Sequence, residues 1–418
     1  MFERLRDLVS EAFLPHPPAQ LGVAVSGGGD STALLHLLQQ FCDRNGVTLH
    51  AVTVDHGLRE GSAAEAAGVA RHCAAIGVAH DTLTWDTWDG SGNLQKEARD
   101  ARYALIAAWA RRKGIDTVAL GHTADDQAET FVMRLSRRSG VDGLSCIGDR
   151  TLRHQITWVR PLLQSRREVL RSYLTAQGVE WVEDPSNEDS RFDRVRAREA
   201  LQVLEGLGIT TEGLAEVASH MSDARKALDW QTFLAAKHIV RIEAGAVIMD
   251  ETALRLQPDE IQRRIIVRAV MWINGSDYAP RRAAVANVRR ALRSGQAGTL
   301  DGCHVRRIAA QIWLFREYNA VRDAEAETTA LWDGRWHMLP QGGADHAPDL
   351  SIRALGQQGL EHCPNWRETG IPHVVLQSTP SIWRGGELVS APLAGVGDSW
   401  HAKLERGTDA FFAALLSH

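Results

Sequence analysis

The 418-residue sequence lacks paired cysteines, long apolar runs and a leader-like N-terminus. Its five cysteines are far apart and form no C-x-x-C pair, so neither a disulfide framework nor a zinc ribbon is predicted. No apolar run reaches the roughly 18 residues that a membrane-spanning helix needs. The first residues mix acids and bases in an amphipathic pattern, unlike a signal peptide. These absences predict a cytoplasmic protein with reduced thiols and no membrane partner.

The net charge of −5 argues weakly against a nucleic-acid partner, but the basic residues are unevenly spread. Residues 261–307 contain ten arginines and two acidic residues, so this stretch is locally +8. A patch of this kind can neutralise the phosphates of a nucleic acid. The charge distribution therefore favours a nucleic-acid partner, although the net charge does not.

One helix is expected within that stretch, with basic residues on one side. In residues 281–295 the apolar residues Val285, Val288 and Leu292 recur at helical spacing, which leaves another face to the arginines. A solvated surface helix is the alternative interpretation. The residues that we expect to bind a phosphate backbone are Arg289, Arg290 and Arg293.

Short apolar runs alternate with helical patterns in the first third of the chain. Strands are expected at 21–25, 49–56, 78–85 and 117–122, each followed by a helix. Strands that alternate with helices of about ten or more residues imply a parallel sheet with helices on both faces. The expected fold class is therefore α/β, with a Rossmann-like, doubly wound parallel sheet whose ligands bind at the carboxyl ends of the strands.

The β/α repeat is lost beyond about Trp158, and three domains are expected. A helical middle region follows to about Ala297, and the remainder is rich in expected strands among glycine and proline residues. We expect an α/β domain over residues 1–205, a mostly helical domain over 206–320 and a small α+β domain over 321–418.

A glycine-rich turn between the first expected strand and helix is suited to phosphate. Glycines let the backbone approach a ligand closely, and the start of a helix presents unpaired N–H groups and the positive end of its dipole to an anion. A helix cap without function is the alternative for the glycines alone, but the strand before and the helix after favour a phosphate site. The residues of this loop are Ser26, Gly27, Gly28, Gly29, Asp30 and Ser31.

Asp30 narrows the prediction to a metal-nucleotide complex. A carboxylate beside bound phosphates repels them unless a divalent cation bridges the two, so Mg²⁺ with ATP is the expected ligand and Asp30 the expected metal ligand. The loop is shorter than the Walker A sequence and lacks its Lys-Ser/Thr ending, so transfer of the terminal phosphoryl group is not implied.

The stretch SGGGDS resembles the S-G-G-x-D-S loop of the PP-loop ATP pyrophosphatases, which split ATP between the α and β phosphates and activate a carbonyl oxygen as its adenylate. The resemblance implies that residues 26–31 hold the pyrophosphate part of ATP. It also implies that the strand end formed by Val54, Asp55 and His56 lies beside the adenosine.

Further stretches resemble the tRNA(Ile)-lysidine synthetase branch of these enzymes, in the same order and at similar spacing. At RVRAR the chain departs from the family's R-N-x-x-R, because Val195 replaces the asparagine. The stretches that carry the resemblance are VDHGLR (54–59), GNLQKEARDARY (92–103), LGHTADDQAET (120–130), RPLL (160–163) and WVEDPSN (181–187).

The resemblance implies a ligase that forms a carbon–nitrogen bond in two steps. ATP adenylates the C2 carbonyl oxygen of the wobble cytidine in a tRNA(Ile) with a CAU anticodon. The ε-amine of free L-lysine then displaces AMP and leaves lysidine, which switches codon reading to AUA. The expected cofactors are ATP and Mg²⁺, and the partners are free lysine and this tRNA; the sequence leaves a homodimer open.

Carboxylates suit the lysine step, because an ammonium ion must be bound and then lose a proton. Asp125, Asp126 and Glu129 have spacings that would group them near the start of one helix, with His122 at the preceding strand end. The resemblance assigns Asp126, Glu129 and His122 to lysine binding and activation, with Asp126 the candidate general base, and Asp125 to substrate binding. Acidic residues that only cap the helix are the alternative, strongest for Asp125.

Arginines are expected to handle the phosphate that leaves with AMP. Arg194 and Arg198 could hold the α phosphate or stabilise the charge that develops on it, and a solvated helical face is the alternative. Arg99 is a further substrate-binding candidate from the family-like helix.

Two other functions are compatible with a PP-loop fold. One is a tRNA 2-thiolation enzyme, which generally needs a sulfur-carrying cysteine or a cluster motif. The other is a nucleotide-binding regulatory protein without catalysis, against which His122, Asp126 and Glu129 argue.

Overall fold

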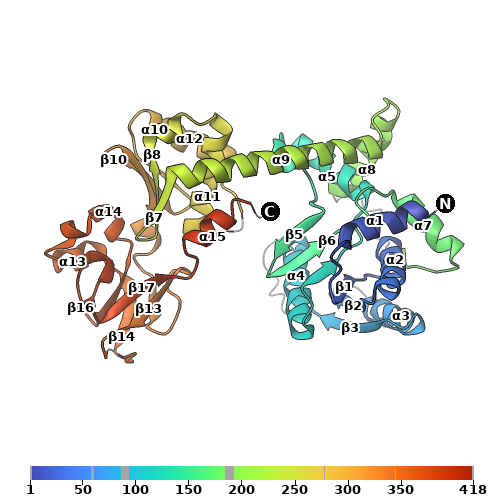
Figure 1. Cartoon of the computed structure of the whole chain (residues 1–418), viewed down its shortest axis with the longest axis horizontal. Coiled ribbons are helices and arrows are strands. Elements are labelled where there is room, and N and C mark those ends of the chain that lie inside the picture. Colours follow the sequence, from blue (N-terminus) through green and yellow to red (C-terminus); the bar gives the residue numbers. More distant parts are fainter. Residues whose placement is uncertain are drawn as a thin grey trace. The chain divides into compact units, whose positions relative to one another are not determined.

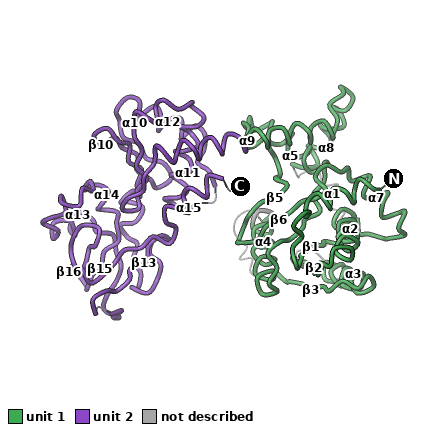
Figure 2. Tube along the Cα trace, viewed as in Figure 1, with its two compact units in different colours: residues 1–225, 418 green, residues 226–417 purple. Residues whose placement is uncertain are grey.

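The computed structural model describes residues 2–57, 61–85, 94–183, 193–276, 278–343 and 345–416. It divides into two compact units, residues 1–225 and 226–417 (Figure 2). Parts of the family-like stretches, at 58–59, 92–93 and 184–187, lie outside the described residues. None of the described helices is long and apolar enough to cross a membrane.

Unit 1 contains a six-stranded sheet with helices on both faces (Figure 1). A long helix, α9 (Thr211–Ile239), begins in this unit and continues into the next. The helices are α1 (Glu3–Phe13), α2 (Gly29–Asn45), α3 (Ser62–Ala75), α4 (Leu94–Lys113), α5 (Ala124–Ser136), α6 (Val141–Leu144), α7 (Arg167–Ala176) and α8 (Asp193–Glu205); the strands are β1 (Gln20–Ala24), β2 (Thr48–Asp55), β3 (Ala79–Thr84), β4 (Thr117–Ala119), β5 (Arg150–Arg153) and β6 (Ile156–Val159).

The order of the strands is β3-β2-β1-β4-β6-β5, and every pair except β5–β6 is parallel. Val23 of β1 pairs with Ala51 on one side and with Ala119 on the other. The chain therefore leaves β1 toward β2 first and reaches β4 on the opposite side later. This reversal makes the carboxyl ends of β1 and β4 a topological switch point, where ligands of such sheets bind.

Two apolar cores cover the two faces of this sheet, which confirms the doubly wound arrangement. One core joins the sheet to α1, α2, α3 and α7, and includes Leu5, Leu34 and Tyr173. The other joins it to α4 through Ile106 and Trp109. The four strands expected from apolar runs are all present, as is the amphipathic N-terminal helix. The hairpin β5–β6 was missed, because its two four-residue strands alternate too briefly to give a clear pattern.

Unit 2 contains three antiparallel sheets and short helices. The five-stranded sheet has the order β7-β8-β11-β10-β9, a four-stranded sheet the order β12-β14-β15-β16, and β13 pairs with β17. The helices are α10 (Glu251–Arg255), α11 (Asp259–Asn274), α12 (Arg282–Arg293), α13 (Gly356–Glu361), α14 (His373–Leu376) and α15 (Thr408–Ala413), with 3₁₀ turns η2 (Tyr318–Ala320), η3 (Trp366–Thr369) and η4 (Pro392–Ala394); the strands are β7 (Val240–Glu243), β8 (Ala246–Asp250), β9 (Gly298–Leu300), β10 (Cys303–Ile308), β11 (Gln311–Arg316), β12 (Glu325–Glu327), β13 (Trp336–Pro340), β14 (Leu350–Ala354), β15 (Pro380–Arg384), β16 (Glu387–Ser390) and β17 (Trp400–Leu404).

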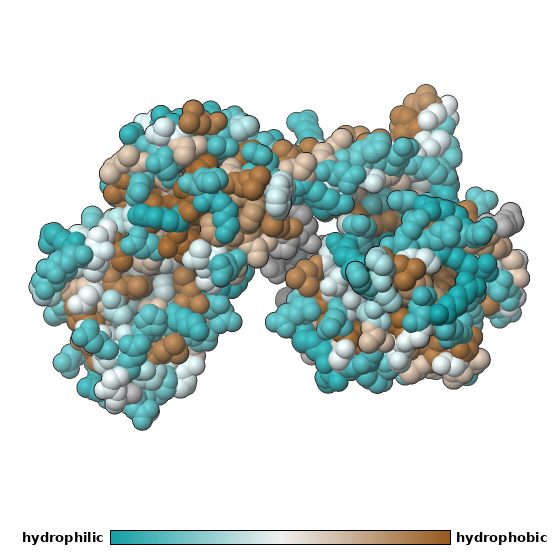
Figure 3. All heavy atoms as spheres, viewed as in Figure 1, coloured by the Kyte–Doolittle hydropathy of each residue, from teal (hydrophilic) through white to brown (hydrophobic). Residues whose placement is uncertain are grey.

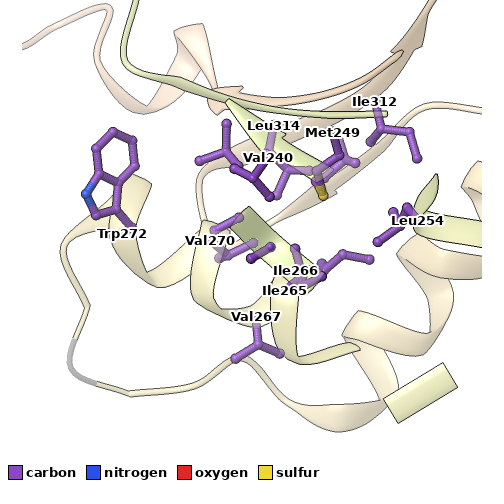
Figure 4. Close-up of a cluster of buried hydrophobic side chains, with 14 of the residues drawn as sticks. Val240, Met249, Leu254, Ile265, Ile266, Val267, Val270, Trp272, Ile312 and Leu314 are labelled. Carbon is purple, nitrogen blue, oxygen red and sulfur yellow. The ribbon is translucent and has the colours of Figure 1, made fainter. Parts of the chain in front are cut away.

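Helices α11 and α12 pack beside each other against the five-stranded sheet and share one core with it. The buried residues Ile265, Ile266 and Val270 of α11 lie against Met249 and Leu314 of the sheet (Figure 4). The region from α9 to α12 is mostly helical, as expected, but the β7–β8 hairpin inside it was not predicted. One apolar core joins the five-stranded sheet to α11, a second joins the same sheet to α13 and α14, and a third includes the four-stranded sheet. The division of this half into two domains stays a prediction.

The surface of both units mixes polar and apolar residues, and apolar areas are visible on each (Figure 3). Val203, Leu207 and Ile209, around the connection from α8 to α9, expose 72%, 74% and 41% of their surface. Single exposed apolar residues are normal on protein surfaces. These three differ from such single residues only because they lie close together in the sequence.

Candidate active site

The loop between β1 and α2 presents unpaired backbone amides at the switch point. Helix α2 begins at Gly29, and its first internal hydrogen bond runs from the Thr32 N–H to the Gly28 carbonyl oxygen (3.0 Å). The amides before Thr32 precede that bond and have no carbonyl partner within the helix. The hydroxyl of Ser31 donates to the same Gly28 oxygen at 3.0 Å and accepts the Ser26 N–H at 3.1 Å. The loop is thus closed on itself, and the amides of Gly29, Asp30 and Ser31 at the start of α2 stay available for an anion.

Glycine is required in and beside this loop. Gly27 has φ of +87°, a conformation that side-chain-bearing residues rarely adopt. A Cβ on Gly121, which follows β4, would lie 3.0 Å from backbone atoms of Asp30 and Ser31. The chain after β4 therefore approaches the first turn of α2 as closely as a glycine allows.

The segment formed by residues 181–183 also contacts the phosphate loop. The Val182 N–H donates to the Gly27 carbonyl oxygen at 2.9 Å, and a Cβ on Gly29 would lie 3.3 Å from the Trp181 ring. The Trp181 indole donates to Glu183 at 2.9 Å. These contacts place the start of the WVEDPSN stretch beside the phosphate loop, whereas its remaining residues lie outside the described part of the chain.

Asp30, at the start of α2, fits a metal-ligand role. Its Oδ2 lies 2.9 Å from Nε of Arg167, and its Oδ1 is buried without a hydrogen-bond partner in the described residues. Burial raises the pKa of Asp30, and Asp126 and Asp125 raise it further, against the opposing effect of Arg167. A buried carboxylate oxygen with no partner suits a hard cation such as Mg²⁺. No group of three potential metal ligands is found in the described residues, so the remaining ligands of such an ion would come from nucleotide and water.

The end of β2 is the segment assigned to the adenosine. Its two polar side chains already form hydrogen bonds with neighbouring residues. Val54 is half-buried, and Asp55 accepts the Gly57 N–H at 2.9 Å, which lowers the pKa of its carboxyl. The His56 ring accepts a hydrogen bond from Arg102 Nε at 3.2 Å and lies edge-on to Trp85. Burial and the charge of Arg102 lower the pKa of His56 to about 4, so this ring is neutral at pH 7.

Helix α5 begins with a capping box that engages Asp126. The Thr123 hydroxyl caps the helix, and Asp126 Oδ2 accepts both the Thr123 N–H (2.9 Å) and the Thr123 hydroxyl (3.1 Å). Asp126 Oδ1 faces Arg167 at 3.5 Å. Burial acts to raise the pKa of Asp126, whereas the charge of Arg167 and the Thr123 N–H lower it; because His122 is neutral, these two account for the ionised carboxylate.

Glu129, one turn further along α5, has a different environment. Its side chain is 1% exposed, and Oε1 lies 2.6 Å from Nε of Arg198 and 3.8 Å from Arg167. Oε2 is buried without a hydrogen-bond partner in the described residues. Burial raises the pKa of Glu129, with Asp126 adding to the effect and Arg198 opposing it. Glu129 therefore combines a free oxygen with increased basicity.

His122 lies between β4 and α5, as expected, and is neutral. Burial lowers its pKa to about 3, and the nearby arginines Arg160 and Arg99 act in the same direction. Its Nδ1 is another buried atom without a hydrogen-bond partner among the described residues. A neutral imidazole with one free nitrogen can accept or donate a single hydrogen bond to a substrate.

Asp125 points to the start of α7 instead of toward the carboxylates. Its Oδ2 accepts the backbone N–H of Arg167 at 2.7 Å, and its Oδ1 lies 3.6 Å from Nε of Arg166. Arg166 itself pairs with Glu212 at 2.7 Å. These contacts favour a helix-capping role for Asp125, and its assignment to substrate binding stays a prediction.

The arginines expected to meet the phosphate differ in exposure. Arg198 is half-buried against Glu129, whereas Arg194, one turn earlier on α8, is exposed, and Val195 between them is half-buried. Arg99 is exposed on α4, above the ring of Tyr103 at 5.5 Å. Arg194 and Arg99 both act to lower the pKa of His122, so both charges lie near that ring.

Arg167 was not singled out from the sequence, yet it contacts three of the candidate carboxylates. In QSRREVL it looks like the surface arginines around it. One signal was available: a cation in the first turn of a helix opposes the helix dipole, so it needs an acidic partner elsewhere. Arg167 is the first residue of α7.

The basic helix of unit 2 forms as expected, but acids outside the counted stretch offset it. Val285, Val288 and Leu292 of α12 are buried. Arg289 and Arg293 both pair with Asp259, at 2.5 and 2.7 Å, whereas Arg290 is exposed and hydrogen-bonds Asn287. The free positive charge of this face is therefore smaller than the sequence count indicated.

The loop after β1, the switch point and the carboxylates after β4 define a nucleotide-binding domain of the PP-loop class, and the family model for the PP-loop domain matches residues 2–204. The tRNA(Ile)-lysidine synthase of Ruegeria pomeroyi is 50% identical over 99% of this chain and 98% of its own length. That of Mesorhizobium japonicum is 40% identical over 80% of this chain and 74% of its own. The chain belongs to the tRNA(Ile)-lysidine synthase family. Among solved structures, the U34-tRNA thiolase NcsA from Methanococcus maripaludis has a TM-score of 0.46 and 14% identity over 53% of this chain and 78% of its own.

Proposed function

We propose that this chain ligates free L-lysine to C2 of the wobble cytidine of a tRNA(Ile) with a CAU anticodon, using ATP and releasing AMP and pyrophosphate. The main support is the meeting, at one switch point, of a phosphate-binding loop with two buried carboxylates of α5, Asp126 and Glu129. Membership of the lysidine synthase family supports the same substrates.

In the first step the C2 carbonyl oxygen of cytidine attacks the α phosphorus of ATP, and pyrophosphate leaves. The amides at the start of α2 and the hydroxyls of Ser26 and Ser31 would bind the β and γ phosphates, with Gly27, Gly28 and Gly29 giving them close access. Mg²⁺, held by Asp30, would neutralise charge on the phosphates. Val54, Asp55 and His56 would border the adenosine.

In the second step the ε-amine of lysine attacks C2, the C2–O bond breaks, and AMP leaves with that oxygen. The ammonium must first lose a proton to a carboxylate. Asp126 was the expected proton acceptor, but both hydrogen bonds on its Oδ2 favour its ionised form. Glu129, with a raised pKa and a free Oε2, is the better acceptor. We assign Asp126 to binding the ammonium and Glu129 to accepting the proton.

Cationic and neutral groups close to these carboxylates would handle the leaving AMP. Arg194 and Arg198 would stabilise its α phosphate, and Arg99 would contact the tRNA near the reacting base. His122, neutral at pH 7, would hydrogen-bond the cytidine or the amine. Cytoplasmic location and a homodimer remain proposals, the second to be checked by light scattering.

The thiolation alternative has little support from the thiols. Burial raises the pKa of Cys42, Cys146 and Cys303 to about 12, and that of Cys73 to about 11. A protonated thiol is a poor nucleophile and a poor cluster ligand. Burial also raises the pKa of Cys363. All five cysteines thus act as small apolar residues.

The test is transfer of radiolabelled lysine to unmodified tRNA(Ile) in the presence of Mg-ATP. We expect acid-precipitable label with the wild type, at least about a hundredfold less with Glu129→Gln, and weaker lysine binding with Asp126→Asn. Glu325→Gln, at an exposed site of unit 2 where the side chain is 59% exposed, serves as the matched control that removes a carboxylate. Equal labelling by Glu129→Gln and the control would refute the role given to Glu129.

Binding of the tRNA backbone is assigned to α12. Replacing Arg289, Arg290 and Arg293 together by Ala should weaken tRNA binding and lower the salt dependence of log K by up to about 3. The measurement is a filter-binding titration at several salt concentrations. Unchanged affinity and slope would remove this helix from the interface.

A further inference from the structure

Arg167 joins two parts of the site that the sequence assigned to different ligands. Its Nε lies 2.9 Å from Asp30 Oδ2, its Nη2 3.5 Å from Asp126 Oδ1 and its Nη1 3.8 Å from Glu129 Oε1. Each nitrogen of one guanidinium thus faces a different carboxylate. Asp30 belongs to the start of α2, whereas the other two carboxylates belong to α5.

The backbone of the same residue is fixed by a fourth carboxylate. The Arg167 N–H donates to Asp125 Oδ2 at 2.7 Å, which ties the first turn of α7 to the first turn of α5. The side chain is 23% exposed, so its charge is only partly screened by water. The carboxylates raise the pKa of Arg167 despite its burial, so it stays a cation. The position of Arg167 is therefore fixed by contacts of both its backbone N–H and its guanidinium.

The three distances are unequal, and the difference has a chemical consequence. Only the contact with Asp30 is within hydrogen-bonding range, and the two contacts with α5 are longer ion pairs. Asp126 Oδ1 and Glu129 Oε2 therefore keep capacity for another donor. Arg167 can orient these carboxylates by its charge without occupying the oxygens that an incoming ammonium needs.

We propose that Arg167 is a positioning residue for both steps of the reaction: it fixes the separation between Asp30, on the nucleotide side, and Asp126 and Glu129, on the amine side. The inference rests on the proposed function of those three residues. It explains why a basic residue starts a helix against its dipole. It also explains why that residue is arginine, since one planar guanidinium spans three partners and a lysine ammonium does not.

The test compares Arg167→Lys and Arg167→Gln with the wild type and with Arg316→Lys. Arg316 is a matched control because it also forms a partly buried ion pair, with Asp333 at 2.9 Å, and lies in unit 2. Three quantities are measured: the affinity for Mg-ATP by calorimetry, adenylation of tRNA without lysine, and the KM and kcat for lysine.

Arg167→Lys keeps a charge that can reach Asp30. We expect its affinity for Mg-ATP to stay within about threefold of the wild type, whereas its KM for lysine rises about tenfold or more and adenylated tRNA accumulates. Arg167→Gln should lose affinity for Mg-ATP as well. Arg316→Lys should match the wild type in all three quantities.

Two outcomes would overturn the inference. One is an unchanged KM for lysine in Arg167→Lys and Arg167→Gln with only a lower kcat, because loss of folded enzyme reduces the number of active sites but not KM. The other is equal behaviour of the two Arg167 variants in Mg-ATP binding. Failure of the proposed function would differ from both, since the wild type itself would then transfer no lysine.

Discussion

Replacing Gly121 by alanine adds one methyl group where the chain after β4 touches the first turn of α2. The new Cβ would lie 3.0 Å from the Asp30 carbonyl oxygen and from the Ser31 nitrogen and Cα, all of them backbone atoms that cannot rotate away. An ordinary contact needs about half an ångström more. The first turn of α2, and with it the amides that would bind phosphate, must therefore move by roughly that amount.

The expected loss of affinity for Mg-ATP follows from the size of that displacement. A misplacement of about 1 Å can cost a hundredfold, so half of it should cost about tenfold in affinity for Mg-ATP, or about 1.4 kcal/mol. Overpacking should also lower the free energy of unfolding by about 1–3 kcal/mol. Gly121→Ala removes no polar group, so a loss of nucleotide binding would come from the backbone shift alone.

The assay is calorimetric titration of Mg-ATP into folded Gly121→Ala, with urea unfolding measured in parallel. Gly68→Ala is the matched control, because Gly68 lies within α3 and the nearest atom to a Cβ there is the end of the Arg71 side chain at 3.8 Å. We expect this control to bind nucleotide like the wild type. Unchanged affinity in Gly121→Ala would refute the claim that the start of α2 binds the phosphates.

Three other predictions follow from single contacts. Asp126→Asn should raise the KM for lysine, whereas Glu129→Gln should mainly lower kcat. If steady-state kinetics showed the opposite, Glu129 would bind the ammonium and Asp126 would accept the proton. Asp259→Asn should free its two arginine partners and strengthen tRNA binding by about threefold at low salt; unchanged affinity in filter binding would argue against α12 as a contact. The depressed pKa of His122 means that the unfolded chain takes up a proton that the folded chain does not, so stability present above about pH 6.5 is lost as pH falls toward 3. His122→Asn should flatten that loss in urea unfolding measured between pH 7 and 5, and an equal slope would contradict a buried neutral ring.

Much of unit 1 could be predicted because the central strands of its sheet are buried. The apolar runs at β1, β2 and β4 are typical of parallel strands covered on both faces, and a glycine turn after the first of them leaves few alternatives for the loop. The order of the segments then placed residues after β1, β2 and β4 at one edge of the sheet. The adjacency of the phosphate loop and α5 follows from that topology alone.

Other features depend on tertiary contacts that no local pattern encodes. The β7–β8 hairpin is short and lies between long helices, so its apolar residues read as part of a helical region. Arg167 resembles Arg166 before it and Arg171 after it in the sequence, and only the arrangement of three carboxylates around it sets it apart. The sequence shows that Arg167 is charged but not which residues surround it in the fold.

The same limit applies to the arginine-rich stretch. Counting charges from residue 261 onward left out Asp259, which precedes the window and pairs with two of the arginines. The helix and its buried face were predicted correctly, since Val285 and Val288 follow the helical period. Its net charge was overestimated because ion pairs are formed in three dimensions.

Mass spectrometry of the treated tRNA tests the central claim most directly. Unmodified tRNA(Ile) with a CAU anticodon is incubated with the wild-type protein, Mg-ATP and lysine, then digested to nucleosides. The account predicts that the wobble cytidine gains the mass of lysine less one water, with AMP and pyrophosphate as the nucleotide products. An unchanged cytidine, a sulfur-for-oxygen mass difference, or release of ADP and phosphate would contradict it.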